Sequence, residues 1–165
     1  KGETLKAALS PDGEWLVASD DELYDAPFLL ETQSMRKIFS ARPFLAWNYS
    51  KYAISPDKRR MGLLHLGSDE PSHLELVDTA TGLLSGDWSP EADTLLTSLA
   101  FNPIGTLVAV GQSNGDIALV DVLSLKTVAT FQAHIGSVTA LTFSRDGVSL
   151  ISAGQDGIVK IWGLP

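Results

Sequence analysis

Short apolar segments alternate along the chain with polar turns, and the same arrangement is repeated four times. The turns begin at a Ser or an Asn, and each lies between two apolar segments of strand length: Ser10, Ser55, Asn102 and Ser144. Successive turns are therefore 45, 47 and 42 residues apart. A period of roughly 40 to 45 residues is typical of propellers and other repeat arrays. The pattern predicts four copies of one structural unit.

Each unit is expected to be an antiparallel sheet of short strands. The apolar segments are rich in β-branched residues and end at Gly, Pro, Asp, Asn or Ser, and no window keeps a helical apolar period over three turns. A third strand is expected in each unit (PFLLET, HLELVDT, DIALVDV and IVKIWGL), and a fourth in the first three (RKIFSA, LLSGDW and TVATFQA). We therefore predict an all-β chain with units over about residues 5–42, 43–89, 95–133 and 134–165, the last without an outer strand.

The repetition also predicts how the sheets pack. One sheet of this size cannot bury both of its faces, so neighbouring units must stack against one another. Radial stacking gives a propeller, whereas a two-sheet sandwich has no reason to repeat its turn at a fixed period. Within the turns, Gly13, Gly105 and Gly147 stand where the hairpin reverses and can take the positive φ that such a reversal needs.

The fourth unit carries the motif of a known family. Its sequence, AHIGSVTALTFSRDGVSLISAGQDGIVKIWG, resembles a WD40 repeat, with a His-bearing lead-in, a hairpin of the form VxxLxFSxDG and a closing Trp. The resemblance implies a WD40-type β-propeller, whose ring usually has about seven blades. It also implies that four residues form the family's structural tetrad: His134, Ser152, Asp156 and Trp162. In such a tetrad indole, hydroxyl, imidazole and carboxylate satisfy one another's hydrogen bonds.

The first three units depart from the family pattern. In the third unit the tetrad positions are occupied by Ala92, Val110, Asn114 and Val120. These residues predict a blade held together by apolar packing alone. The second unit keeps the dipeptide Val77-Asp78 at the end of its third strand but lengthens its middle loop, and the first ends that strand in Leu30-Glu31.

Catalytic chemistry finds little support in the sequence. His134, Asp156 and Ser152 are the residue types of a hydrolase triad, but Ser152 is expected inside a strand and not on a G-x-S-x-G elbow. There is no Cys and no phosphate-binding glycine motif, and a Gly/Pro-bearing loop separates His65 from His73. The inner strands also lack the His and carboxylates of a metal-dependent propeller hydrolase. We therefore predict no enzymatic activity, no cofactor and no metal.

The formal net charge of −8 narrows the range of partners. It repels polyanions and so disfavours nucleic acid, while it either steers basic partners or keeps the domain soluble. No apolar run reaches the roughly 18 to 20 residues of a membrane-spanning helix, so we expect no membrane insertion. The first four residues are neither an initiator Met nor a signal stretch, so the chain is expected to begin inside a longer polypeptide, in the cytoplasm or the nucleus.

The function expected is that of a platform for other proteins or peptide segments. By resemblance, partner contacts fall on the top face, just before and within each first strand and just before the tetrad Asp: Asn48, Ser50, Leu95, Thr97, Ser113, Ser137, Thr139 and Gln155. This set is small and neutral, which suits hydrogen bonding to a peptide. Trp47 is either a further contact or an interblade packing residue. An RNA-associated assembly scaffold is the alternative, and a propeller hydrolase a more distant one.

The sequence leaves open how the ring is completed. We expect the missing outer strand and the remaining blades to come from the same or another chain. Three arrangements are compatible with the residues: the C-terminal part of a larger propeller, a homodimer of eight blades, and an autonomous ring of four.

Overall fold

The computed structural model describes residues 6–19, 27–40, 49–65, 71–91 and 93–164. Within these ranges every regular element is a β-strand, as the sequence predicts. The same ranges contain no helix of the length and apolar character needed to cross a membrane.

The strands form four antiparallel sheets that follow one another along the chain, which we call blades 1 to 4. Blade 1 contains β1 (Lys6–Leu9), β2 (Trp15–Ser19), β3 (Phe28–Glu31) and β4 (Lys37–Ser40). Blade 2 contains β5 (Tyr49–Ile54), β6 (Arg60–His65), β7 (His73–Asp78) and β8 (Leu84–Trp88). Blade 3 contains β9 (Leu96–Phe101), β10 (Leu107–Gln112), β11 (Asp116–Asp121) and β12 (Thr127–Gln132), and blade 4 contains β13 (Val138–Phe143), β14 (Ser149–Gly154) and β15 (Val159–Gly163).

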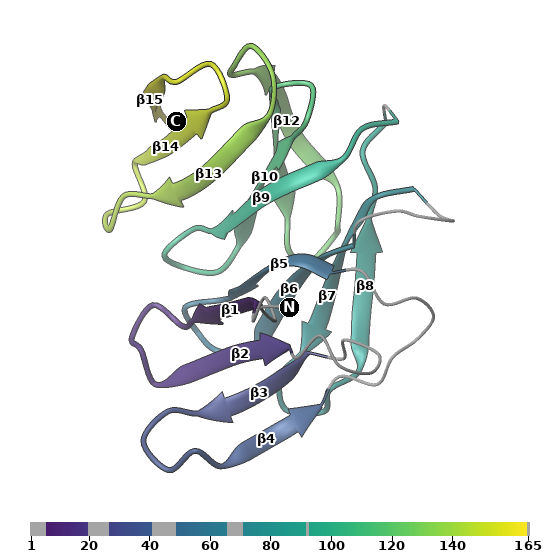
Figure 1. Ribbon diagram of the computed structural model, residues 1–165, viewed down its shortest axis with the longest axis vertical. Helices are drawn as coiled ribbons and strands as arrows, with labels where there is room; N and C mark the ends of the chain where they lie inside the picture. Colours follow the sequence, from purple (N-terminus) through teal and green to yellow (C-terminus); the bar gives the residue numbers. More distant parts are fainter. Residues whose placement is uncertain (1–5, 20–26, 41–48, 66–70, 92, 165) are drawn as a thin grey trace, which may run out of the picture.

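The blades are arranged as parts of a propeller, which confirms the predicted fold class. In each blade the strands pair in sequence order, and the first strands β1, β5, β9 and β13 lie on the inner side of the arrangement (Figure 1). The four blades form an arc that is open between blade 1 and blade 4 (Figure 1). The described residues therefore form an open arrangement of four blades.

Side-chain hydrogen bonds explain why the hairpin between the first two strands of each blade forms. In blades 1, 2 and 4 the Ser hydroxyl that opens the turn donates to an Asp two residues later at 2.6 Å. The same hydroxyl oxygen accepts the amide five residues along the chain at 2.9 Å. In blade 3, Asn102 Oδ1 replaces this pair by accepting the amides of Thr106 and Leu107, at 2.8 and 3.0 Å.

The reversal itself needs a left-handed backbone, and three blades meet that need with glycine. The φ angles of Gly13, Gly105 and Gly147 are 75°, 72° and 76°, as the sequence predicts. Blade 2 has Lys58 at this position, with a φ of 60°. Its ammonium lies 2.6 Å from Asp12 of blade 1, so a residue that is less suited to the turn links two blades.

Three apolar clusters hold successive blades together. Between blades 1 and 2 the fully buried Val17 and Leu29 pack against the cluster of Ile54 and Met61. Equivalent clusters lie between blades 2 and 3 and between blades 3 and 4, as predicted for units that bury their faces on one another. Since every sheet carries apolar side chains on both faces, each inner blade has two packing surfaces.

Candidate functional site

Four side chains of blade 4 form one hydrogen-bonded chain. The Trp162 indole N–H donates to Ser152 Oγ at 2.9 Å, and Ser152 Oγ lies 2.7 Å from His134 Nε2. On the other side of the ring, His134 Nδ1 lies 3.0 and 3.1 Å from the two carboxylate oxygens of Asp156. Ser152 and Trp162 belong to β14 and β15, whereas His134 and Asp156 lie in the segments that precede β13 and β15.

The two ends of this chain fix the direction of the hydrogen bonds that they make. An indole N–H can only donate and a carboxylate can only accept. Ser152 therefore accepts from Trp162, while the Nδ1–H of His134 donates to Asp156. With the contact between Ser152 Oγ and His134 Nε2, each polar side-chain group of the chain has a partner.

Asp156 also joins the loops on either side of it. Its carboxylate accepts the Ile135 and Ile158 amides, each at 3.1 Å. Burial alone raises the pKa of the Asp156 carboxyl, but hydrogen bonds from the Ile158 and Ile135 amides and from His134 outweigh burial and hold the pKa below its usual value. The carboxylate is therefore ionised near neutral pH and anchors the lead-in segment to the β14–β15 turn.

The fit around the imidazole leaves no room for a side chain at position 154. A Cβ on Gly154 would lie 2.3 Å from the His134 ring and 2.7 Å from Asp156. The Trp162 ring packs at 4.8 Å, centroid to centroid, on Phe131 of blade 3. The network thus ties β14 and β15 to the lead-in segment and to the preceding blade.

Burial argues against using this network as a hydrolase triad. Ser152 is 1% exposed and its oxygen lies within hydrogen-bonding distance of both Trp162 and His134. A nucleophile must reach the substrate carbonyl, and this hydroxyl is buried. The arrangement is suited to holding a blade together.

Blade 3 has apolar residues at the two strand positions where blade 4 has Ser152 and Trp162. Val110 and Val120 are both completely buried, in the cluster shared with blade 2. Asn114 does not reach across the blade, since its amide donates to Asp116 at 2.8 Å. Ala92 lies outside the described residues.

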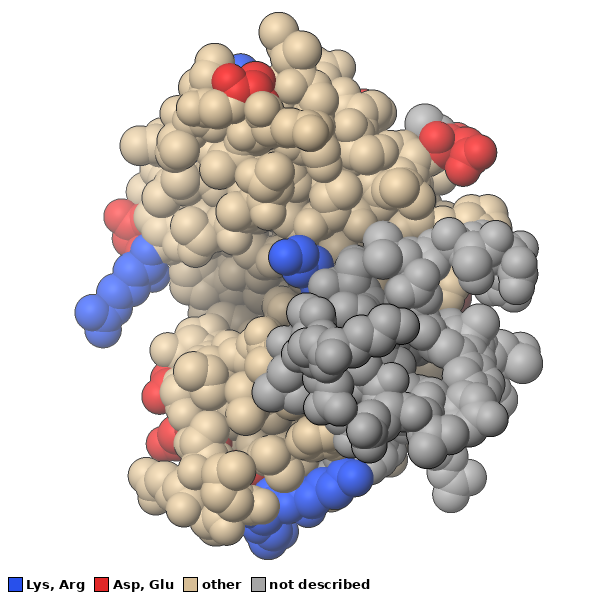
Figure 2. Space-filling model, viewed as in Figure 1, with Lys and Arg blue, Asp and Glu red and all other residues tan. Residues whose placement is uncertain are grey.

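Two backbone hydrogen bonds place the expected partner-contact residues in equivalent positions of blades 3 and 4. The Ser113 amide donates to the Leu95 carbonyl, and the Gln155 amide donates to the Ser137 carbonyl, each at 2.8 Å. Thr139 and Gln155 are exposed, Leu95 is 48% exposed, and Ser113 and Ser137 are half-buried. Figure 2 views the molecule from one face of the arc, and charged side chains are sparse on its described part.

Of the remaining expected contact residues, Thr97 is the blade 3 equivalent of Thr139 but is half-buried. The Thr97 hydroxyl donates to the Val138 carbonyl at 2.6 Å, which joins blades 3 and 4. Asn48 and Trp47 lie outside the described residues, and of Ser50 only the backbone, in β5, is described. Sequence reasoning did not single out Ile135, which is 87% exposed and directly follows His134. Ile135 could have been found in the sequence as an apolar residue among the polar residues that precede the first strand of blade 4.

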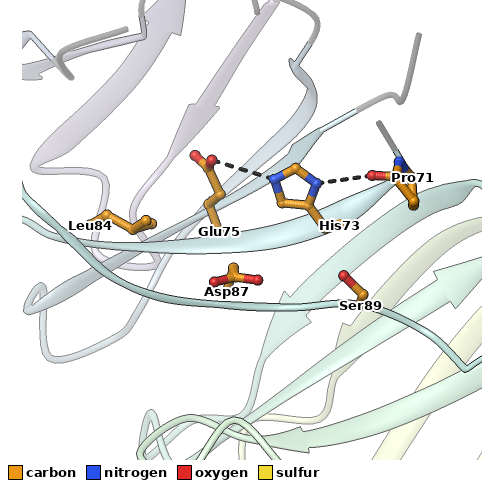
Figure 3. Close-up of a pocket in the computed structure, with 6 residues that line it drawn as sticks. All are labelled: Pro71, His73, Glu75, Leu84, Asp87 and Ser89. Atoms are coloured by element: carbon orange, nitrogen blue, oxygen red, sulfur yellow. Dashed lines mark hydrogen bonds and ion pairs between the residues drawn. The ribbon is translucent and has the colours of Figure 1, made fainter. Parts of the chain in front are cut away.

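Sequence reasoning also missed a surface pocket on blade 2. The pocket, of about 350 Å³, is lined by Pro71, His73, Glu75, Leu84, Asp87 and Ser89 (Figure 3). Glu75 and Asp87 are direct partners in the β7–β8 register, so two carboxylates lie opposite each other. His73 contacts the Pro71 carbonyl at 3.0 Å and Glu75 at 3.4 Å. The hydrogen bond with Glu75 raises the pKa of His73, against the opposing effect of burial, so the imidazole partly balances the two carboxylates.

No set of three or more His, Asp or Glu side chains in the described part of the chain is placed to hold a metal ion. His65 stacks on His73 with ring centroids 4.7 Å apart, which is a ring contact across β6 and β7.

Comparison with known families gives a match near the end of the sequence. The model of the family described as "WD domain, G-beta repeat" matches residues 125–163. The matched segment begins in the turn before β12, the outer strand of blade 3, and ends at the last residue of β15. It contains the whole hydrogen-bonded chain of blade 4.

Several curated proteins are similar to parts of the chain. The guanine nucleotide-binding protein subunit beta of Solanum tuberosum is 36% identical over 115 residues, which cover 65% of this chain and 29% of that protein. Pre-mRNA-processing factor 19 homolog 2 of Arabidopsis thaliana is 41% identical over 68 residues, covering 41% of this chain and 13% of that protein. The retinoblastoma-binding protein 5 homolog of Drosophila melanogaster is 38% identical over 76 residues, covering 46% and 16%. The chain thus spans less than a third of the length of these relatives.

Proposed function

We propose a function from the premise that the chain belongs to the WD40-repeat β-propeller family, which the matched repeat, the relatives and the arrangement of the blades support. The function is that of a non-catalytic scaffold, which binds other proteins or peptide segments and holds them in a multiprotein complex. Relatives that carry the same repeat support an interaction scaffold in general terms.

The observation that carries this proposal is a backbone hydrogen bond that is repeated in blades 3 and 4. In each blade one amide-to-carbonyl hydrogen bond of 2.8 Å joins the entry to the first strand with the turn between the second and third strands. The residues joined by this hydrogen bond directly precede or follow a strand, so the sheet holds their backbone in place. A partner that binds them loses little of its binding energy to ordering a loop.

The chemistry of the displayed side chains favours a peptide or protein partner. Ser137 and Gln155 offer neutral donors and acceptors, and Leu95 and Ile135 add exposed apolar surface beside them. The hydroxyls of Thr139 and Ser113 already bond within the chain, to the Ala153 carbonyl and to the Leu95 amide, each at 3.1 Å. Peptide backbones present both N–H and C=O groups, so neutral polar side chains that both donate and accept can satisfy them. A highly charged ligand would find no matching cluster of opposite charge in this set.

A quantitative binding comparison tests the proposal. We expect Gln155→Lys and Thr139→Arg to lower the recovery of co-purifying proteins at least tenfold, because each places a long charged side chain on the contact surface. Lys126→Gln, on the turn before β12, is the control for a changed charge away from these positions. Circular dichroism melting of each variant checks the fold, and unchanged recovery with Gln155→Lys and Thr139→Arg would contradict the proposal.

A second candidate is a scaffold within an RNA-processing assembly. Its support is the printed names of two relatives, Pre-mRNA-processing factor 19 homolog 2 and the pre-rRNA-processing protein IPI3 of Mycosarcoma maydis. With a net charge of −8, this chain would join such an assembly through its proteins and not through the RNA. Filter binding with single-stranded RNA tests this directly: we expect no retention at physiological salt, and salt-sensitive retention would favour direct RNA contact.

The cellular location belongs to the same proposal. A scaffold of this kind would act in the cytoplasm or the nucleus. Microscopy of the full-length protein carrying a fluorescent tag distinguishes these compartments from a membrane-bound or secreted location.

A further inference from the structure

We propose that a pocket between blades 2 and 3 binds the guanidinium group of an arginine side chain from a partner protein. Trp88 and Glu91 line the pocket from blade 2 and the segment that follows it, and Gln112 and Asp116 line it from blade 3. The contact residues proposed above are not among its described lining residues, so this site stands independently of them.

The side-chain amide of Gln112 is buried without a partner from the chain. Gln112 is only 4% exposed, and no residue in the described part of the chain forms a hydrogen bond with its side-chain amide. A buried amide without a partner is costly, because it has lost its hydrogen bonds to bulk water. Since Gln112 lines the pocket, a ligand in the pocket can supply the missing partners.

The neighbouring blades fill the position that is equivalent to Gln112. Gln112 is the last residue of β10, and the last residues of β6 and β14 are His65 and Gly154. The His65 ring stacks on His73, with ring centroids 4.7 Å apart. At Gly154 the His134 ring takes the space, since it lies 2.3 Å from where a Cβ would be. Of these three blades, blade 3 is the one that presents an amide to a pocket at this position.

The residues of blade 3 explain why this amide is not satisfied from within. The sequence has Ala92 and Asn114 at the positions where the network of blade 4 has a His and an Asp. An Ala side chain has no polar group, and the Asn114 amide donates to Asp116 at 2.8 Å. Gln112 thus has no counterpart of the polar network that stabilises blade 4.

The charged groups of the pocket are carboxylates. Glu91 and Asp116 line it, and no Lys, Arg or His is among its described lining residues. Asp116 is half-buried, whereas Glu91 is exposed and forms no ion pair with a described residue. Glu91 also borders a neighbouring hollow of about 270 Å³, which Asp93 lines as well. In a chain with a net charge of −8, these carboxylates favour a cationic ligand.

The size of the pocket suits one side chain. Its volume is about 200 Å³, below the roughly 300 to 1,000 Å³ of sites that enclose a whole small molecule. Pro90 and the largely buried ring of Trp88 form an apolar wall, and the Trp88 indole N–H donates to Thr127 at 3.0 Å, which holds the ring in place. An aliphatic stem can pack on this wall while its charged end meets the polar groups.

A guanidinium matches these polar groups better than an ammonium does. The acceptors are the Gln112 carbonyl oxygen, the two carboxylates and the Thr130 hydroxyl, which come from four segments of the chain. A guanidinium presents five N–H donors in one plane and stacks on aromatic rings, whereas an ammonium has three donors at one point. The amino group of Gln112 can in turn donate to a main-chain carbonyl, which favours arginine within a peptide segment.

An NMR titration of the 165-residue chain with blocked arginine, Nα-acetyl-arginine N-methylamide, tests the proposal. We expect the side-chain amide signals of Gln112 to shift in a saturable way, with a dissociation constant on the order of 1 mM for a single residue. The loss of these signals in Gln112→Leu identifies them. If the Gln112 signals show no saturable shift, the proposal is wrong.

Two further probes test which feature of arginine is recognised. Blocked citrulline has the shape of arginine without its charge, so we expect it to bind roughly tenfold more weakly. Blocked lysine keeps the charge but lacks the planar fork, and we expect it to bind more weakly than arginine. Equal binding of citrulline, or binding of lysine as strong as that of arginine, would overturn the assignment of a guanidinium site.

The variant Gln112→Leu separates a binding role from a structural one. It keeps a buried side chain of similar size without the amide, so we expect roughly tenfold weaker arginine binding and an unchanged or higher midpoint of thermal unfolding. A purely structural amide predicts a lower midpoint. Gln33→Leu, at an exposed Gln on the turn between β3 and β4, is the matched control.

The variant Asp116→Asn tests the charge and does not depend on the folding of Gln112→Leu. It removes one carboxylate charge from the pocket, and we expect arginine binding about fivefold weaker. Glu31→Gln, at the end of β3 in blade 1, changes the net charge equally and should leave arginine binding unchanged. Unchanged arginine binding in folded Gln112→Leu or in Asp116→Asn would overturn the proposal.

Discussion

Blades 3 and 4 have the same strand plan but fill the same inner positions in opposite ways. Blade 4 places Ser152 and Trp162 on the face that packs on blade 3, and blade 3 places Val110 and Val120 on the face that packs on blade 2. Both solutions are buried, since Val110, Val120 and Ser152 are at most 1% exposed. The position therefore requires burial and shape, and it does not by itself require polarity.

This difference indicates that blade 4 needs polar partners because it has Trp162 at a position where blade 3 has Val120. An indole N–H buried without an acceptor is costly, so Trp162 needs Ser152, and the other three groups complete the chain. A Val makes no such demand. Trp88 of blade 2 follows the same rule by another route, because its indole donates to Thr127 of blade 3 at 3.0 Å.

The largest effect that separates the two blades is expected from Gly154→Ala. The new methyl group would lie 2.3 Å from the His134 ring, so the imidazole must move and the network must break. We expect a loss of about 3 kcal/mol in the free energy of unfolding, measured by urea denaturation. Gly163→Ala is the matched control, because a Cβ there meets no atom within 4 Å, and an equal loss in both variants would show that the fit around His134 is not the cause.

Ser152→Val, which gives blade 4 the residue of blade 3, tests the demand of the Trp directly. It removes the acceptor of Trp162 and the partner of His134 Nε2, so we expect a loss of about 2 kcal/mol. Adding Trp162→Phe to Ser152→Val removes the unsatisfied indole, so the second change should cost less than Trp162→Phe costs alone. A double-mutant cycle by denaturant unfolding measures this coupling, and strict additivity would contradict the argument.

The first turns of the two blades allow a smaller exchange. Asn102→Ser gives blade 3 the Ser of blade 4, but position 104 is Ile and cannot supply the Asp, so we expect a loss of about 1 kcal/mol. Adding Ile104→Asp, at a position 73% exposed, should recover most of that loss. Thermal unfolding of the single and double variants decides the matter, and no recovery would show that the two turns are not interchangeable.

Acid should separate the two blades by the smallest effect. The pKa of Asp146 is lowered, chiefly by its hydrogen bond with Ser144, and that of Asp156 is lowered as described above. A lowered pKa gives stability that is complete above the ordinary value near 3.8 and is lost as the pH falls through the folded-state value. The equivalent residues of blade 3, Ile104 and Asn114, do not titrate.

Hydrogen exchange measures this difference locally. Between pH 5 and pH 3, protection factors of the Val148 and Ser149 amides should fall more than those of Thr106 and Leu107. An equal decline in both turns would show that acid loosens the fold as a whole and not the Asp-based turn.

Much of the architecture could be predicted because the relevant signals are local. The period of the turns and the short β-branched strands predicted the all-β propeller, and the resemblance of the fourth unit to a WD40 repeat implied a network of His134, Ser152, Asp156 and Trp162. The direction of the hydrogen bonds and the closeness of Gly154 to the imidazole needed coordinates, because they depend on how β14 and the lead-in segment approach each other.

What the sequence did not reveal depends on contacts between blades. From the sequence, Thr97 is expected to be a free polar residue. In the structure its hydroxyl donates a hydrogen bond to the Val138 carbonyl of the next blade. Lys58 gives no turn signal, and its positive φ becomes understandable once Asp12 is seen beside it.

The matched repeat runs from the end of one blade into the next, since residues 125–163 include β12 of blade 3 and all three strands of blade 4. The segment matched as one repeat is therefore offset by one strand from the segments that pack as sheets. Inserting one such segment would add an outer strand to the blade before it and the first three strands of a new blade. Because the matched segment spans two sheets, it links blade 3 to blade 4 covalently as well as by packing.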